Sequence, residues 1–126
     1  LLRAAKVQKR AAKAGFDWND EQGPIDKIDE ELYQKYLYQE LSHVPRIKIL
    51  TSPDASMLSF VIDGMHVLDF GARIGARDIC VRVGNMCATW IHNLMGVPGT
   101  IRLSVGACNT MDEIKYTVQV IKDIVK

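Results

Sequence analysis

Hydrophobic residues recur at two different spacings along the chain, and the change of spacing separates predicted helices from predicted strands. Between Pro24 and about His43 they come at steps of three and four residues, which predicts a long amphipathic helix. The positions on its apolar face are Ile25, Ile28, Leu32, Tyr36, Leu37 and Leu41. Beyond it, the segment 46–50 (RIKIL) alternates apolar with charged residues, as a strand with one exposed face does. Three further apolar, β-rich runs predict strands at 57–64, 79–84 and 100–106.

Helices are also predicted between these strands and at both ends of the chain. The last helix is well marked, because Thr110 and Glu113 have the spacing of a capping box and apolar residues follow at helical spacing. At the other end, residues 1–14 mix apolar with basic residues at helical spacing, and Gly15 marks the expected stop. The remaining predicted helices lie at 66–78 and 88–96, and the last covers 109–126.

The order of these elements predicts the class of fold. Two helices precede two strands, and helices then alternate with the remaining strands. We therefore expect an α/β protein of the two-layer α+β type, with a small, mainly antiparallel four-stranded sheet covered by helices. An N-terminal helical arm or hairpin precedes it. The 126 residues are enough to bury a core of their own.

Composition excludes several classes of function. The net charge is +1, so nothing in the overall balance favours nucleic acid or an anionic membrane as a partner. No apolar run approaches the length of a membrane span, and the basic first segment lacks the features of a secretory signal. The three cysteines are an odd number without C-x-x-C spacing, which indicates free thiols in a reducing compartment. We expect a cytoplasmic protein.

Candidate chemistry centres on Cys87. Arg82 lies five residues before it and Arg102 fifteen residues after it. An unpaired cysteine can be a small buried hydrophobe, or a reactive thiol among cationic neighbours, and the residues alone leave both open. Cys80 lies in an apolar run and is expected in the core, whereas Cys108 is as compatible with the core as with the surface. The three histidines, at 43, 66 and 92, lack metal-ligand spacing, so we expect surface or capping roles.

From about residue 33 onward the chain resembles a known family. The segments are ELSHVPRIKILTSP, HVLDFGARIGARDICVRVGNMCA and MGVPGTIRLSVGACNTMDEI. They contain His66-x-x-Asp69, V-R-x-G-x-x-C-A over 81–88, and P-x-x-x-R-x-S over 98–104. In order and spacing these motifs resemble the C-terminal small domain of PLP-dependent cysteine desulfurases of the SufS-like class, within the class V aminotransferase group.

The resemblance assigns roles to three residues. It implies that Cys87 is the catalytic cysteine, whose thiolate attacks the sulfur of PLP-bound L-cysteine and becomes a persulfide. It implies that Arg102 binds the substrate carboxylate and that Arg82 stands beside the cysteine loop as a second substrate-binding residue. Nearby positive charge favours a thiolate, and a planar guanidinium suits a carboxylate. The chain departs from the family at Asn85 and Met86, since many members carry histidine before the cysteine.

The family's large domain has no counterpart in the chain. That domain supplies the lysine that binds PLP, and no lysine here matches its motif. The resemblance therefore implies that the chain alone binds no cofactor and is inactive in isolation. A PLP-bearing large domain or a homo-oligomer is the expected partner.

Residues 1–32 resemble a different family, the MazG-type nucleotide pyrophosphohydrolases. Glu30 and Glu31 match the first two acids of its E-E-x-x-E motif, but Gln34 replaces the third. We therefore divide the chain into a MazG-like helical segment (1–32) and a desulfurase-like small domain (33–126), with the exact join left open. Three functions follow: a catalytic-cysteine domain, a non-catalytic recombined or engineered chimera, and, as the weakest, a pyrophosphohydrolase.

Overall fold

The computed structural model describes Lys13 and residues 22–126, with side chains from residue 25 onward and at Lys13. The predicted first helix over 1–14 lies outside the described residues, except that Lys13 is helical. The element order in the described part is α2 (Gln22–Ser42), β1 (Ile47–Ile49), β2 (Leu58–Ile62), α3 (Val67–Gly75), β3 (Arg82–Gly84), α4 (Thr89–Met95), β4 (Thr100–Leu103) and α5 (Met111–Val125). Each predicted element from residue 22 onward is present, with most ends one to three residues inside the expected ones.

The four strands form one sheet in the order β1-β2-β4-β3, and every neighbouring pair is antiparallel. This confirms the predicted two-layer α+β fold with a four-stranded sheet. Its alternating strand pattern is clearest in β2, where Leu58, Phe60 and Ile62 are buried and the residues between them are half-buried. Successive side chains of a strand point to opposite faces, so one face of the sheet carries the core.

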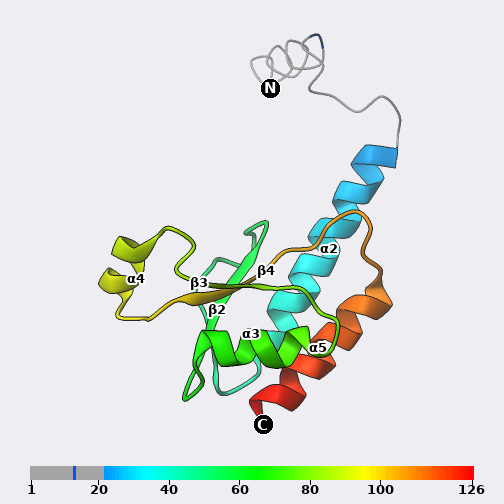
Figure 1. The fold of residues 1–126 in the computed structure, drawn as a ribbon. Helices are drawn as coiled ribbons and strands as arrows, with labels where there is room; N and C mark the ends of the chain where they lie inside the picture. The colour runs from blue at the N-terminus through cyan, green and yellow to red at the C-terminus, as the bar shows by residue number, and fades with distance from the viewer. Residues whose placement is uncertain (1–12, 14–21) are drawn as a thin grey trace.

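Three helices, α2, α3 and α5, cover that face (Figure 1). The stripe of α5 is buried as predicted, and Ile114, Val118, Ile121 and Val125 all belong to the core. Phe70 of α3 meets Phe60 of β2 edge to face, with ring centroids 6.0 Å apart. The short helix α4 projects from one end of the sheet, away from these three helices (Figure 1).

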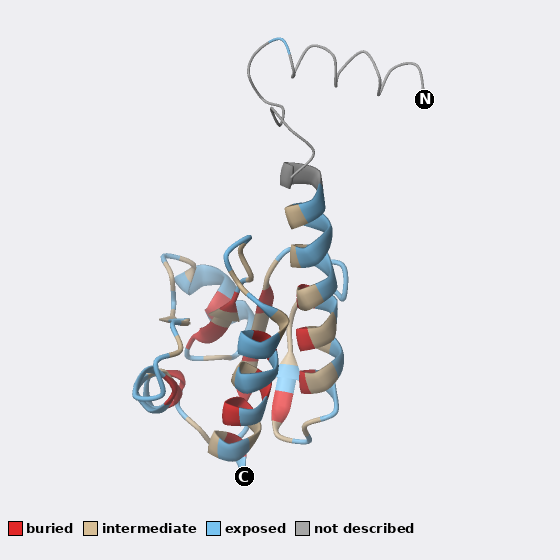
Figure 2. Cartoon of the chain, turned by 90° about the vertical axis from the view of Figure 1, so that its right-hand side faces the viewer, coloured by how far each residue is buried: buried red, intermediate tan, exposed pale blue. Residues whose placement is uncertain are grey.

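The apolar face predicted for α2 is buried in only part of the helix. Leu37 and Leu41 are buried, but Ile28 and Leu32 are 66% and 53% exposed. The reason is geometric, because α2 is longer than the sheet it covers and its N-terminal half extends beyond the other elements (Figure 2). Helical periodicity identifies the face of a helix that is apolar, but not how much of its length meets a partner.

Side-chain hydrogen bonds and backbone conformation determine where three of the helices begin or end. Thr110 and Glu113 form the predicted capping box, with the Thr110 side chain accepting from the Glu113 N–H and Glu113 accepting from the Thr110 N–H. His66 caps α3 by accepting from the N–H of Leu68 at 3.3 Å. Gly96 ends α4 in the left-handed conformation, with φ of 65°.

The second face of the sheet carries the polar residues of the strands. Ser59, Arg102 and Arg82 are Cα partners in one row across β2, β4 and β3. Lys48 of β1 is exposed on the same side, one row further along. Within the described residues, no helix is both long and apolar enough to cross a membrane.

Candidate functional site

A strained turn presents Cys87. It follows β3, and both Met86 and Cys87 adopt positive φ, at 48° and 62°, a conformation that non-glycine residues rarely take. The Ala88 N–H closes the turn by donating to the Asn85 carbonyl at 2.8 Å. Cys87 is exposed, which is not compatible with the alternative of a buried core cysteine. Strained backbone of this kind concentrates at functional sites.

The two predicted arginines lie next to each other. Arg82 of β3 and Arg102 of β4 are directly paired Cα partners, so their side chains leave the same face of the sheet. Arg82 is exposed and Arg102 is half-buried. Placing two cations opposite each other costs free energy, which makes the pair suited to an anionic ligand.

Arg102 is joined to the cysteine turn through Met86. Its Nη1 donates to the Met86 sulfur at 3.1 Å, and Met86 directly precedes Cys87. Its Nε and Nη2 donate to the sulfur of Met57 at 3.1 and 2.8 Å. Three ion pairs join described residues, all of them between a lysine and a carboxylate, and neither Arg82 nor Arg102 takes part. Arg102 thus contacts the residue before Cys87 and is the cross-strand partner of Arg82, and no ion pair among the described residues neutralises either arginine.

Sequence patterns did not identify Met57 or Met86 as part of this site. Met86 is one of two positions, with Asn85, where the chain departs from the family members that carry histidine before the cysteine, and Met57 lies 45 residues before Arg102. No periodicity or motif connects residues that far apart. The only available signal was the position of Met86 beside the cysteine.

Two other sequence expectations are wrong. Cys80, expected in the core, is exposed because β3 begins only at Arg82. His92, expected at the surface or in a cap, is buried, with 6% exposure. Its Nδ1 donates to the Ala88 carbonyl at 2.8 Å, and its Nε2 lies 3.2 Å from the Thr100 hydroxyl. His92 therefore ties α4 and the end of the cysteine turn to β4.

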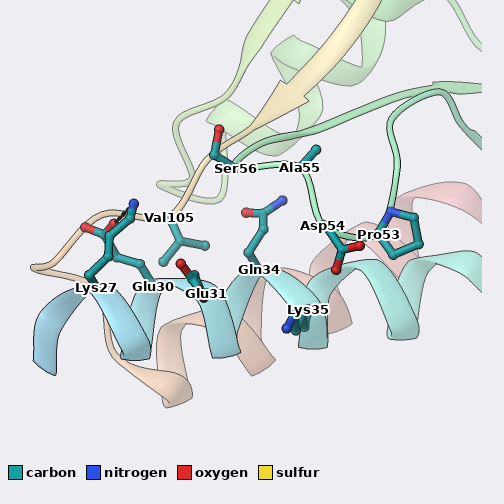
Figure 3. Close-up of a pocket in the computed structure, with 10 residues that line it drawn as sticks. All are labelled: Lys27, Glu30, Glu31, Gln34, Lys35, Pro53, Asp54, Ala55, Ser56 and Val105. Carbon is teal, nitrogen blue, oxygen red and sulfur yellow. Dashed lines mark hydrogen bonds and ion pairs between the residues drawn. The ribbon is translucent and has the colours of Figure 1, made fainter. Parts of the chain in front are cut away.

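A separate cavity of about 190 Å³ lies between the N-terminal half of α2 and residues 53–56 (Figure 3). Gln34 points from α2 across this cavity toward Ala55 and Ser56. It is 6% exposed, and its Oε1 lacks a hydrogen-bond partner in the described structure. Neither Cys87 nor either arginine lines this cavity.

Glu30 and Glu31 of α2 contribute negative charge to the lining of this cavity. Lys27 and Glu30 form an ion pair at 2.8 Å, and the hydrogen bond that Lys27 donates to Glu30 raises the pKa of Lys27 above its ordinary value. Over Lys13 and residues 22–126, no group of three His, Cys, Asp or Glu side chains is placed to hold a metal ion. The MazG resemblance of residues 1–32 stays a prediction.

The described lysines do not fit PLP. A lysine that forms a Schiff base with PLP is typically buried, since burial lowers its pKa. Every lysine that the structure describes is exposed or half-exposed, and Lys122 and Lys126 are ion-paired with Glu40 and Asp123. This part of the chain therefore offers a thiol and a cationic pair but no Schiff-base site.

Comparison with known proteins gives the family. Residues 8–117 match the family model described as aminotransferase class-V. The chain therefore belongs to the class-V aminotransferase family. Within that family its sequence matches cysteine desulfurases. It is 36% identical over 116 residues to a probable cysteine desulfurase of Vibrio cholerae, covering 88% of this chain and 28% of that protein. A probable cysteine desulfurase of Pseudomonas aeruginosa is 36% identical over 69 residues, covering 55% of this chain and 17% of that protein.

Solved structures share the fold. The apo structure of the cysteine desulfurase from Thermococcus onnurineus NA1 matches with a TM-score of 0.70 and 25% identity, over 76% of this chain and 25% of that one. The cysteine desulfurase CsdA of Escherichia coli gives a TM-score of 0.69 and 23% identity, over 75% and 24%. A structure of C-DES with glycine covalently linked to PLP has a TM-score of 0.57 and 19% identity, over 73% and 22%. The chain thus spans about a quarter of the length of these proteins.

Proposed function

We propose that the chain is the catalytic-cysteine small domain of a cysteine desulfurase, and that Cys87 carries the sulfur taken from L-cysteine as a persulfide. The observation that carries this proposal is the turn that exposes Cys87 at the end of β3, one residue from the methionine that contacts Arg102. The exposed thiol and the adjacent cations are the features that such a nucleophile needs.

Each residue has a distinct part in the proposed reaction. The Arg102 guanidinium binds the α-carboxylate of L-cysteine, and Arg82 adds a second positive charge on the same face. The Cys87 thiolate attacks the sulfur of the substrate and forms the sulfur–sulfur bond as the carbon–sulfur bond breaks. That carbon retains the electron pair, so the reaction needs an electron acceptor, which PLP provides in this family.

We place the PLP site outside the residues described here. The class-V relatives are about four times the length of the matched segment, and the described lysines do not fit a Schiff base. A PLP-bearing large domain, in the same polypeptide or in a separate one, would complete the site. We accordingly expect no desulfurase activity from the 126-residue chain alone.

A hybrid enzyme tests this proposal. The matching segment of the Vibrio cholerae relative is replaced by this chain, and sulfide release from L-cysteine is measured once PLP absorbance confirms a folded, loaded protein. We expect activity that is abolished by Cys87→Ser and retained by Cys80→Ser, since both cysteines are exposed but only Cys87 lies on the strained turn. A PLP-loaded hybrid without sulfide release would contradict the proposal and favour a non-catalytic chimera.

A further inference from the structure

The contacts of the Arg102 guanidinium are unusual in kind. An arginine inside a protein site is commonly paired with a carboxylate, which fixes it and cancels its charge. Arg102 instead donates through Nε, Nη1 and Nη2 to two thioether sulfurs, those of Met57 and Met86. A thioether is neutral and a weak acceptor, so it orients the guanidinium without neutralising it.

The two methionines reach Arg102 from opposite sides. Arg102 lies on β4, between β2 and β3 in the sheet. Met57 immediately precedes β2, and Met86 follows β3 in the cysteine turn. Both methionines are partly buried. The guanidinium is therefore held between two elements that the sheet itself positions.

We propose that Met57 and Met86 are positioning residues that keep Arg102 ordered and charged for the carboxylate of an amino-acid substrate. This inference rests on the proposed function and adds two residues to its site. A flexible arginine loses side-chain freedom when it binds a ligand, whereas one already held in place loses less. An arginine paired with an acid would have to give up that acid first. With the two thioether contacts, Arg102 is already ordered before the ligand binds, and no acid has to be displaced.

Leucine substitutions remove the sulfur and nearly preserve the volume. The probe is L-serine, which has the carboxylate and ammonium of L-cysteine without the reactive thiol. Binding to the 126-residue chain is followed by NMR through the Arg102 Nε–Hε resonance. We expect Met57→Leu and Met86→Leu to broaden that resonance and to weaken L-serine binding roughly three- to tenfold, as expected for losing one preordered side chain. The control is Met95→Leu, an exposed methionine on α4, which should change neither.

A second variant separates orientation from charge. Met57→Glu would keep the guanidinium ordered but would pair it with a carboxylate. We expect a sharp Nε–Hε resonance together with L-serine binding weakened more than in Met57→Leu, because the ligand must now compete with the new carboxylate. A role in packing alone does not predict this combination.

The outcomes distinguish this inference from the proposed function. If Arg102→Gln abolishes L-serine binding while both leucine variants bind like wild type, the positioning role is overturned and the carboxylate site stands. Wild-type binding by Met57→Glu would likewise overturn the positioning role. If Arg102→Gln itself binds L-serine like wild type, the assigned role of Arg102 in the proposed function and this inference both fail.

Discussion

Arg82 and Arg102 stand directly opposite each other across the antiparallel pair β3–β4, with both side chains on the face of the sheet that carries its polar residues. Strand pairing alone does not require two cations at this position, and like charges in opposed positions destabilise a sheet. In the proposed function, the substrate carboxylate supplies the negative charge that offsets this repulsion. The arginine pair also connects this small sheet with the chemistry that we propose for Cys87.

The opposed arginines make a prediction about stability. Arg82→Thr removes the repulsion and places a β-branched residue in a strand, so we expect the free energy of unfolding to rise by about 0.2–1 kcal/mol. The gain should shrink at high salt, which screens exposed charges. Urea denaturation at low and high ionic strength measures both effects. Lys48→Thr is the control, because Val61 is its cross-strand partner. A destabilised Arg82→Thr protein would show that the arginine pair does not strain the sheet.

Gln34 gives a second prediction. Its Oε1 is buried and bonds to none of the described residues, and a polar atom in that state costs about 1–3 kcal/mol. Gln34→Leu should therefore increase the midpoint of urea denaturation, with a gain of roughly 1 kcal/mol. Gln39→Leu, at an exposed position of the same helix, should have little effect. A large loss of stability in Gln34→Leu would mean that the amide is bonded in solution.

His92 gives a third prediction. Its ring joins the Ala88 carbonyl to the Thr100 hydroxyl inside the structure. His92→Ala should destabilise the protein by about 1–3 kcal/mol, because buried hydrogen bonds are lost. It should also loosen the turn that ends at Ala88 and so change the alkylation rate of Cys87. Asn93→Ala, an exposed neighbour, is the matched control. Unchanged stability in His92→Ala would contradict this role.

The fourth prediction concerns the loss of folding stability at low pH. Glu40 of α2 pairs with Lys122 of α5 at 2.7 Å, and the hydrogen bond from Lys122 lowers the pKa of Glu40 below its ordinary value of 4.5. A carboxyl whose pKa is lower in the folded protein stabilises it above the unfolded pKa, and that contribution disappears as pH falls through the folded pKa.

Below about pH 4.5, the free energy of unfolding should therefore fall less steeply with decreasing pH in Glu40→Gln than in wild type. The substitution should have little effect on the protein's other acid-sensitive groups. Urea unfolding measured from pH 7 down to pH 3 gives this slope. Glu31→Gln, an exposed acid on the same helix, is the comparison and should keep the wild-type slope. Identical slopes in wild type and Glu40→Gln would show that the ion pair does not form in solution.

Features set by residues close together in the sequence could be predicted, whereas contacts between residues far apart in the sequence could not. The capping box at Thr110 and Glu113 and the stripe of α5 were predictable, because both depend on residues a few positions apart. Cys87 was singled out by the resemblance of its surrounding motif to cysteine desulfurases, since the residues alone left a buried cysteine and a reactive one open. The exposure of Cys80 was not predictable, since it depends on where β3 begins. The contact between Met57 and Arg102 spans 45 residues and exists only once β2 and β4 pair.

The position of the sulfur atom after turnover tests the proposed role of Cys87 most directly. The hybrid enzyme is incubated with L-cysteine, its free thiols are blocked, and the peptides containing Cys80, Cys87 and Cys108 are analysed by mass spectrometry. All three cysteines are exposed, so access alone does not favour one of them. We expect one added sulfur atom on Cys87 and none on the other two. Sulfur on Cys80 or Cys108, or on no cysteine of a PLP-loaded hybrid, would contradict this role.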